Sequence, residues 1–245
     1  MATISPAPVG RQDRDRLFFT SMGLFVALVV FAGFAPTYYL AGLVPRPARA
    51  PEMTTLLHIH GAAFTFWILL GVVQPALIAG GNRDLHRRLG VAAAGLAALV
   101  WTLGNIVSLK AIHSGYKGLG DPYAFYAITF FSMQAFGIIV LLGIWKRREA
   151  ETHKRLMLLS SAAILEAAVG RLPLAFVAET APLSFYVGAD SVILAGALYD
   201  RLARGAVHKV WIWGGGALIV SQFLRVAIMH SRPWLDFAHA LAAYA

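Results

Sequence analysis

The stretch LHIHGAAFTFWILLGVVQPALIAGGNRDLHRRLG, from Leu57 to Gly90, decides the fold. It joins a long apolar run to a Gly-Gly-Asn turn and then to a cationic segment that opens the next apolar run. A helix needs about 20 mainly apolar residues to cross a hydrocarbon layer roughly 30 Å thick. The stretch therefore predicts a transmembrane helix, a tight turn and the start of a second transmembrane helix.

The same pattern recurs along the whole chain. Of the 245 residues 58% are apolar and only 13% are charged, whereas a water-soluble domain carries about 25% charged residues. We predict an all-α fold, a polytopic helical bundle with seven transmembrane helices. Residues 1–16 are predicted to form a cytoplasmic tail, residues 17–230 the transmembrane domain, and residues 231–245 a periplasmic tail. The seven apolar blocks are Leu17–Val44, Leu56–Ala79, Leu89–Leu109, Tyr123–Trp145, Leu156–Val177, Pro182–Tyr199 and Val210–Met229.

The cations predict the orientation. Lys and Arg concentrate in cytoplasmic loops of membrane proteins, and an N-terminus in the cytoplasm puts 14 of them inside and five outside. The net charge of +9 then reflects topology and contact with anionic lipid, and we expect no nucleic-acid partner. The inner group is Arg11, Arg14, Arg16, Arg83, Arg87, Arg88, Lys146, Arg147, Arg148, Lys154, Arg155, Arg201, Arg204 and Lys209, and the outer group is Arg46, Arg49, Lys110, Lys117 and Arg232.

Two classes of chemistry are excluded by missing residues. The chain has no cysteine, which excludes disulfides, thiolate metal sites and covalent haem attachment through a CxxCH motif. No apolar block holds a lysine near its centre, so a retinal Schiff base is excluded as well.

A histidine followed by a cation marks the start of three apolar blocks. His86 lies in DLHRRL, His153 in ETHKRL and His208 in AVHKVW. All three fall on the predicted cytoplasmic side, in or next to the first helical turn, where backbone N–H groups lack partners. We favour a structural role for them and keep, as the alternative, a cytoplasmic cofactor site formed by two of the three.

Four ionisable side chains lie inside the predicted membrane spans, namely Glu166, Arg171, Asp190 and Arg225. Such residues are rare in hydrocarbon and usually pair with each other or line a cavity. At a rise of about 1.5 Å per residue, Arg225 lies roughly 26 Å from His208 along its helix, so the polar groups gather in the outer half. Asn105 and Gln222 are expected at the same level, with Gln222 on the same helix face as Arg225. We predict a polar chamber there, or two buried ion pairs that join an arginine to Asp190 or Glu166.

Three histidines in this outer half are candidate ligands. His58 and His60 are two residues apart and cannot face the same point from a helix, so one of them is the candidate, with His230 as its partner. Our first hypothesis is a redox-type protein that binds haem b or copper through His60 or His58 together with His230, with Arg171 and Arg225 beside the cofactor. Imidazole and thioether groups both suit Cu(I).

Two alternatives remain open. In the first, Arg171 and Arg225 hold a small anionic solute while Glu166 and Asp190 carry protons, as in a transporter. In the second, the protein is a membrane assembly factor without a small ligand, which a closed and fully paired chamber would favour. Whether the protein is an enzyme stays open.

Several motifs carry a resemblance. The segments LHIHGAAFTFWILLGVVQPALIAGGNRDLHRRLG, THKRLML, GRLP and YDRLARGAVHKVWIWGG resemble a group of uncharacterised bacterial seven-helix integral membrane proteins. The HRRLG-type helix starts are more distantly similar to DUF2306-type membrane proteins and to cytochrome b561-like haem bundles. The resemblance implies a multi-pass protein of the bacterial inner membrane, and the b561 likeness implies haem b. In such haem bundles the ligand histidines lie within the spans, whereas His86, His153 and His208 lie at helix starts.

Overall fold

Long apolar runs between short polar turns give an all-helical chain. The computed structural model describes residues 10–47, 50–113 and 120–244. Residues 1–9 of the predicted tail, and Arg49 and Lys117 of the predicted outer loops, lie outside the described residues. The elements are α1 (Arg11–Phe34), η1 (Ala35–Tyr39), α2 (Thr55–Ala79), α3 (Arg83–His113), α4 (Pro122–Trp145), α5 (Ala150–Ala162), α6 (Glu166–Val169), α7 (Ala175–Glu179), η2 (Leu183–Tyr186), α8 (Val187–Arg204), η3 (Val210–Gly215), α9 (Gly216–Ile228) and α10 (Arg232–Ala242).

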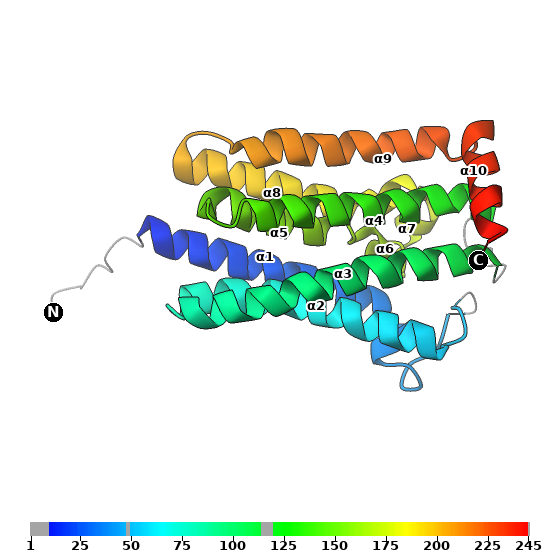
Figure 1. Ribbon diagram of the computed structural model, residues 1–245, viewed down its shortest axis with the longest axis horizontal. Helices are drawn as coiled ribbons and strands as arrows, with labels where there is room; N and C mark the ends of the chain where they lie inside the picture. Colours follow the sequence, from blue (N-terminus) through cyan, green and yellow to red (C-terminus); the bar gives the residue numbers. More distant parts are fainter. Residues whose placement is uncertain (1–9, 48–49, 114–119, 245) are drawn as a thin grey trace, which may run out of the picture.

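The long helices run lengthwise beside each other, and neighbours in sequence are neighbours in space (Figure 1). Contacts join α1 to α2, α2 to α3, α3 to α4 and α4 to α5, while α1 also packs on α5, α6 and α8. Helix α4 has the largest buried share among the candidate spans, 44% against 17–28% for the others. The bundle is therefore built around α4, which contacts α3, α5, α9 and α10.

Five of the described helical segments are long and apolar enough to cross a membrane. They are Gln12–Tyr39, Thr55–Ala79, Arg83–His113, Pro122–Trp145 and Val210–Ile228. Each corresponds to one of the seven predicted blocks. The side chains that point away from the bundle are large and apolar, with Phe66 61% exposed and Phe223 62% exposed. A surface of this kind is compatible with lipid and incompatible with water over such an area.

The fifth predicted block is not one continuous helix, contrary to the sequence-based expectation. Helix α5 ends at Ala162, a turn follows over residues 163–165, and α6 begins at Glu166. The backbone tightens here, because the Leu165 N–H donates to the Ala162 carbonyl three residues back instead of four. A second interruption lies near Arg171, where α6 ends at Val169 and helix resumes only at Ala175. Pro173 lies in this gap and has no N–H group to continue the helix. The sixth block likewise starts as η2 and becomes an α-helix only at Val187.

Both predicted tails contain helix. Helix α1 begins at Arg11, within the segment that we expected to be a tail. Residues 232–242, also expected to be a tail, form α10, which lies across the end of the bundle instead of along it (Figure 1). Its buried residues Trp234, Ala238 and Ala242 pack in one cluster with Ile112 of α3 and Ala127 of α4. The Trp234 indole N–H also donates to the Tyr123 carbonyl over 2.9 Å. An apolar face on every third or fourth residue explains why this segment is a helix that covers a hydrophobic surface.

Helix α1 approaches α6 so closely that only glycine fits at Gly33. A Cβ atom at Gly33 would lie 2.2 Å from the carbonyl oxygen of Ala168, two residues after Glu166. Gly95 on α3 is the matched control, because nothing lies within 4 Å of a Cβ built there.

We expect Gly33→Ala to destabilise the protein by roughly 1–3 kcal/mol, since overpacking forces the two backbones apart. Gly95→Ala should be neutral or slightly stabilising, because it only removes the helix penalty of glycine, about 0.5–1 kcal/mol. Thermal unfolding of both variants in detergent measures the difference. Equal melting temperatures would show that α1 and α6 do not need this approach.

Candidate functional site

A buried ion pair joins α9 to α6 beneath the surface of the bundle. Arg225 is 2% exposed and Glu166 is 6% exposed. The Arg225 Nη1 atom lies 3.1 Å from Glu166 Oε2. Ser132 of α4 completes the arrangement, because its hydroxyl accepts from Arg225 Nη1 over 2.7 Å and donates to Glu166 Oε1. The prediction that Arg225 reaches an acid on a neighbouring helix is therefore confirmed, with Glu166 as the acid.

The geometry of this pair follows from the helix interruption. Glu166 is the first residue of α6 and follows directly on the turn at residues 163–165. Arg225 lies in the last turn of the continuous helix α9, and Ser221 one turn earlier accepts from Arg225 Nη2 over 3.0 Å. The arginine is therefore held by a regular helix, while the carboxylate sits at a joint between two helical pieces. Such joints are where transporters place their binding groups.

Three more polar side chains border the pair. Tyr186 of η2 is buried and lies beside Arg225, within electrostatic reach of both Glu166 and Asp190. Gln222, which is buried, lies beside Asp190 on α8, which is half-buried. The prediction that Gln222 and Arg225 share a buried face is confirmed.

Several polar atoms around the pair are left without a hydrogen bond. Among the described residues, the Tyr186 hydroxyl, Arg225 Nε and Asp190 Oδ1 are buried and make none. Buried polar groups are hydrogen-bonded in the great majority of cases, and the exceptions need an explanation. The site is thus a neutral pair surrounded by unused donors and an unused acceptor.

Arg171 and Asn105 lie outside this cluster. The Arg171 side chain is exposed, donates to the Ala167 carbonyl over 2.6 Å and lies 4.7 Å from the centre of the Phe34 ring. Asn105 of α3 accepts from the Gln134 amide of α4 over 2.9 Å. This Asn105–Gln134 pair is a separate polar link between α3 and α4.

The three candidate ligand histidines are not brought together. His58 and His60 lie on α2 and His230 follows α9, and these two helices lie on opposite sides of the bundle with α3 and α4 between them (Figure 1). The His60 ring packs on Phe64 at 4.2 Å. Across the described segments, no group of three or more His, Asp or Glu residues could hold a metal ion. This donor set does not fit haem b or copper, and that hypothesis stays a prediction from sequence.

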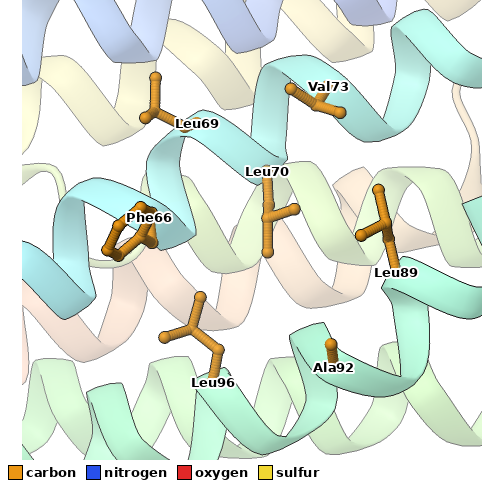
Figure 2. A pocket seen from close by; sticks show the side chains of 7 residues that line it. All are labelled: Phe66, Leu69, Leu70, Val73, Leu89, Ala92 and Leu96. Carbon is orange, nitrogen blue, oxygen red and sulfur yellow. The ribbon is translucent and has the colours of Figure 1, made fainter.

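A groove of about 320 Å³ lies between α2 and α3, away from the ion pair. Figure 2 shows its lining, with Phe66, Leu69, Leu70 and Val73 from α2 and Leu89, Ala92 and Leu96 from α3. All these side chains are hydrocarbon, so they offer no group that could orient a polar solute. The groove is not the polar chamber that we expected from the sequence.

The cationic ends of the helices meet in a second, larger cluster of charges. Arg155 of α5 and Asp200 of α8 are completely buried and form a bidentate pair, with Arg155 Nε 2.7 Å from Asp200 Oδ2. Arg155 also donates to the Glu151 carboxylate over 2.9 Å, and Glu151 is in turn 2.9 Å from Arg204. A bidentate pair with additional donors is the arrangement that offsets the desolvation of buried charges best.

The first helix joins this cluster through Asp15. Lys154 lies 2.8 Å from Asp15, and Arg204 and the Tyr199 hydroxyl both donate to the same carboxylate. We name the six charged side chains the basal network, which consists of Asp15, Glu151, Asp200, Lys154, Arg155 and Arg204. Its formal charge is zero, and it ties α1, α5 and α8 at one end of the bundle. Protein carboxylates therefore hold these cations, two of which lie near the start of α5 and one at the end of α8.

The recurrent histidines make contacts at helix ends. The His153 Nδ1–H donates to the Gly143 carbonyl in the last turn of α4 over 2.8 Å. The Gln74 amide, in the orientation that satisfies its neighbours, donates to His86 Nδ1 over 2.6 Å and so links α2 to α3. His208 Nδ1 accepts from the Val210 N–H over 3.2 Å at the start of η3. These contacts favour the structural interpretation of all three histidines, although the His86 and His153 rings lie only 6.4 Å apart.

Sequence reasoning missed Ser132, Tyr186 and the basal network. A serine or a tyrosine in an apolar helix is common, so neither residue gives a signal until the fold brings Glu166 and Arg225 to it. Asp15 and Asp200 stand in the charged stretches RQDRDR and YDRLAR. An acidic residue within a cationic stretch could have been used to predict an ion pair there.

No protein-family model, no curated protein and no solved structure matches the chain. The likeness to seven-helix membrane proteins and b561-type bundles therefore stays a prediction. What the chain does must follow from its own residues.

His208 gives a pH-dependent prediction. Burial lowers the pKa of His208 below its ordinary value of 6.5, and the nearby Arg155 guanidinium lowers it further. Because the folded protein favours the neutral ring, this contribution to stability is present above pH 6.5 and is lost as the pH falls. We expect the melting temperature to fall by several degrees between pH 7.5 and pH 5.5.

The control is His208→Asn, since asparagine can accept the Val210 N–H in the same manner and does not titrate in this range. Its melting temperature should change less than that of the wild type over the same interval. An equal change in both proteins would remove His208 as the cause.

Proposed function

We propose that the protein is a transporter of the bacterial inner membrane that couples the movement of a small anionic solute to protons. Arg225 attracts the anion, and Glu166 and Asp190 carry protons. The observation that supports this most is the buried Glu166–Arg225 pair at the start of the short helix α6, with hydrogen-bonding groups around it left unused.

A purely structural pair fits the surroundings less well. A buried pair that only stabilises is expected to have its remaining hydrogen bonds satisfied. Here Arg225 Nε, the Tyr186 hydroxyl and Asp190 Oδ1 are unused among the described groups. A membrane assembly factor without a ligand does not require these groups, whereas a site that binds a polar solute does.

Arg225 and Arg171 differ in what they can do. Arg225 is enclosed by α4, α6 and α9, while Arg171 is exposed beside Phe34. An anion in a site closed to water interacts far more strongly with an enclosed guanidinium than with an exposed one. We therefore assign the anion to Arg225.

The proposed topology has seven crossings with the N-terminus in the cytoplasm. The segment from α5 to α7, and the segment η2–α8, would add two interrupted crossings to the five long helices. The basal network then lies at the cytoplasmic face, next to exposed cations such as Arg83, Arg87 and Arg148, which suit anionic headgroups. Helix α10 would lie at the periplasmic face.

The topology makes a direct prediction. Alkaline phosphatase fused after Ala245 should be active, because it folds only in the periplasm, and a green fluorescent protein at the same place should stay dark. A fluorescent C-terminal fusion would reverse the orientation and move the basal network to the outside.

Transport is tested in liposomes that contain purified protein and a pH-sensitive dye. An inward gradient of a transported anion, sought among glycolate, lactate, nitrate and phosphate, should acidify the lumen. We expect Glu166→Gln and Arg225→Gln to abolish this proton flux, and Asp190→Asn to reduce it at least severalfold.

The matched control is Asn105→Ala, which breaks the separate Asn105–Gln134 pair at a similar depth. It should keep the wild-type rate. Flux that survives in Glu166→Gln, or that no anion elicits in any protein with a normal melting temperature, would contradict the proposal.

A further inference from the structure

The way in which Glu166 is held points to the kind of anion. Each of its two oxygens has a separate donor, with Oε1 taking the Ser132 hydroxyl and Oε2 taking Arg225 Nη1. Two further donors belong to the same group of side chains, namely Arg225 Nε and the hydroxyl of Tyr186, which lies next to Arg225, and neither makes a hydrogen bond among the described residues. We propose that Glu166 occupies the place of the substrate's own carboxylate, so that the substrate is a short-chain monocarboxylate carried with one proton. This inference rests on the proposed transport function and names its substrate.

Charge sets the valence of the substrate. In the structure Glu166 and Arg225 are a neutral pair enclosed by protein. When an anion with one charge binds Arg225, the site keeps its neutrality only if Glu166 takes up one proton. A dianion would leave an uncompensated charge in hydrocarbon, which is costly. One proton and one monocarboxylate are therefore carried together in the same direction, and the transport is electroneutral.

Shape favours a carboxylate over a halide. Two donors on two different oxygens match a planar anion, and a spherical ion could not contact both in the same way. The space that becomes available is the space of the departing side chain, which is two methylene groups and a carboxyl. An anion of the size of propionate fills it, and a longer chain would need more space than the departing side chain frees.

Binding is measured by calorimetry on the purified full-length protein in detergent, with propionate as the probe. Propionate should bind with uptake of one proton, seen as a heat that varies with the ionisation enthalpy of the buffer. Its affinity should fall about tenfold for each pH unit once Glu166 is ionised. Glu166→Gln, which is neutral at every pH, should bind propionate with an affinity independent of pH and without proton uptake.

Tyr186→Phe is the discriminating variant. The Tyr186 hydroxyl makes no hydrogen bond to the described residues, so its removal should leave the melting temperature unchanged and weaken propionate binding by roughly tenfold or more. Malonate and chloride should bind at least tenfold more weakly than propionate.

The outcomes separate this inference from the proposed function. Proton flux driven only by phosphate or nitrate, with no propionate binding, would overturn the substrate and leave transport intact. Propionate binding with proton uptake but no flux would support the site and overturn transport. The inference would be overturned if Arg225→Lys and Tyr186→Phe both bound propionate as tightly as the wild type. It would also be overturned if the affinity of Glu166→Gln for propionate depended on pH as strongly as that of the wild type.

Discussion

A charge placed in hydrocarbon must be paired, and this constraint shapes the centre of the molecule. Translocon measurements put the cost of one Arg or Asp at a helix centre at about 2.5–3.5 kcal/mol, and a buried group left without its partner costs more. Glu166 and Arg225 lie on different helices, so the pair can form only if α6, α9 and α4 meet. The interruption before Glu166, the hydroxyl of Ser132 and the close approach of Gly33 to Ala168 all serve this meeting.

The basal network and the Glu166–Arg225 pair differ in how completely their polar atoms are hydrogen-bonded. At the basal end, three acids and three cations form a network that is neutral and densely hydrogen-bonded, with Arg155 and Asp200 completely buried. Around Glu166 the pair is also neutral, but donors remain unused. Saturated polar networks make a structure rigid, and unsaturated ones are open to a ligand or to water. Arg204 Nε is the one buried atom of the described basal network that makes no hydrogen bond, against Arg225 Nε, the Tyr186 hydroxyl and Asp190 Oδ1 around Glu166. The larger number of such atoms distinguishes the candidate functional cluster from the structural one.

Much of the fold could be predicted from the sequence, and its chemistry only in part. Long apolar runs with cationic starts indicated the helices, the position of the recurrent histidines at one end, and a shared face for Gln222 and Arg225. The interruption before Glu166 could not be predicted, because residues 162–165 contain no glycine or proline, whereas Pro173 gives a signal for the second interruption after Val169. Residues 231–245 were predicted to form a tail and not a helix, although every third or fourth residue of α10 is apolar.

The candidate site is defined by distances between residues on different helices, and these distances cannot be read from the spacing of residues in the sequence. Arg225 was expected to reach either Glu166 or Asp190, and the choice between them follows from how α6 and α8 are turned. Tyr186 and Ser132 can be recognised as site residues only once the fold places them next to Arg225. The histidine hypothesis had equal depth on two helices in its favour, yet depth along a membrane says nothing about which side of the bundle a helix occupies.

Asp15 has a consequence for biosynthesis. Its partners Lys154, Tyr199 and Arg204 follow it by 139, 184 and 189 residues, so the ribosome makes them long after the first helix has left it. Until then the carboxylate at the start of that helix has to remain in contact with water or headgroups. The first helix can therefore reach its final position only after Arg204 has been synthesised, when the last candidate span and α10 are still to come.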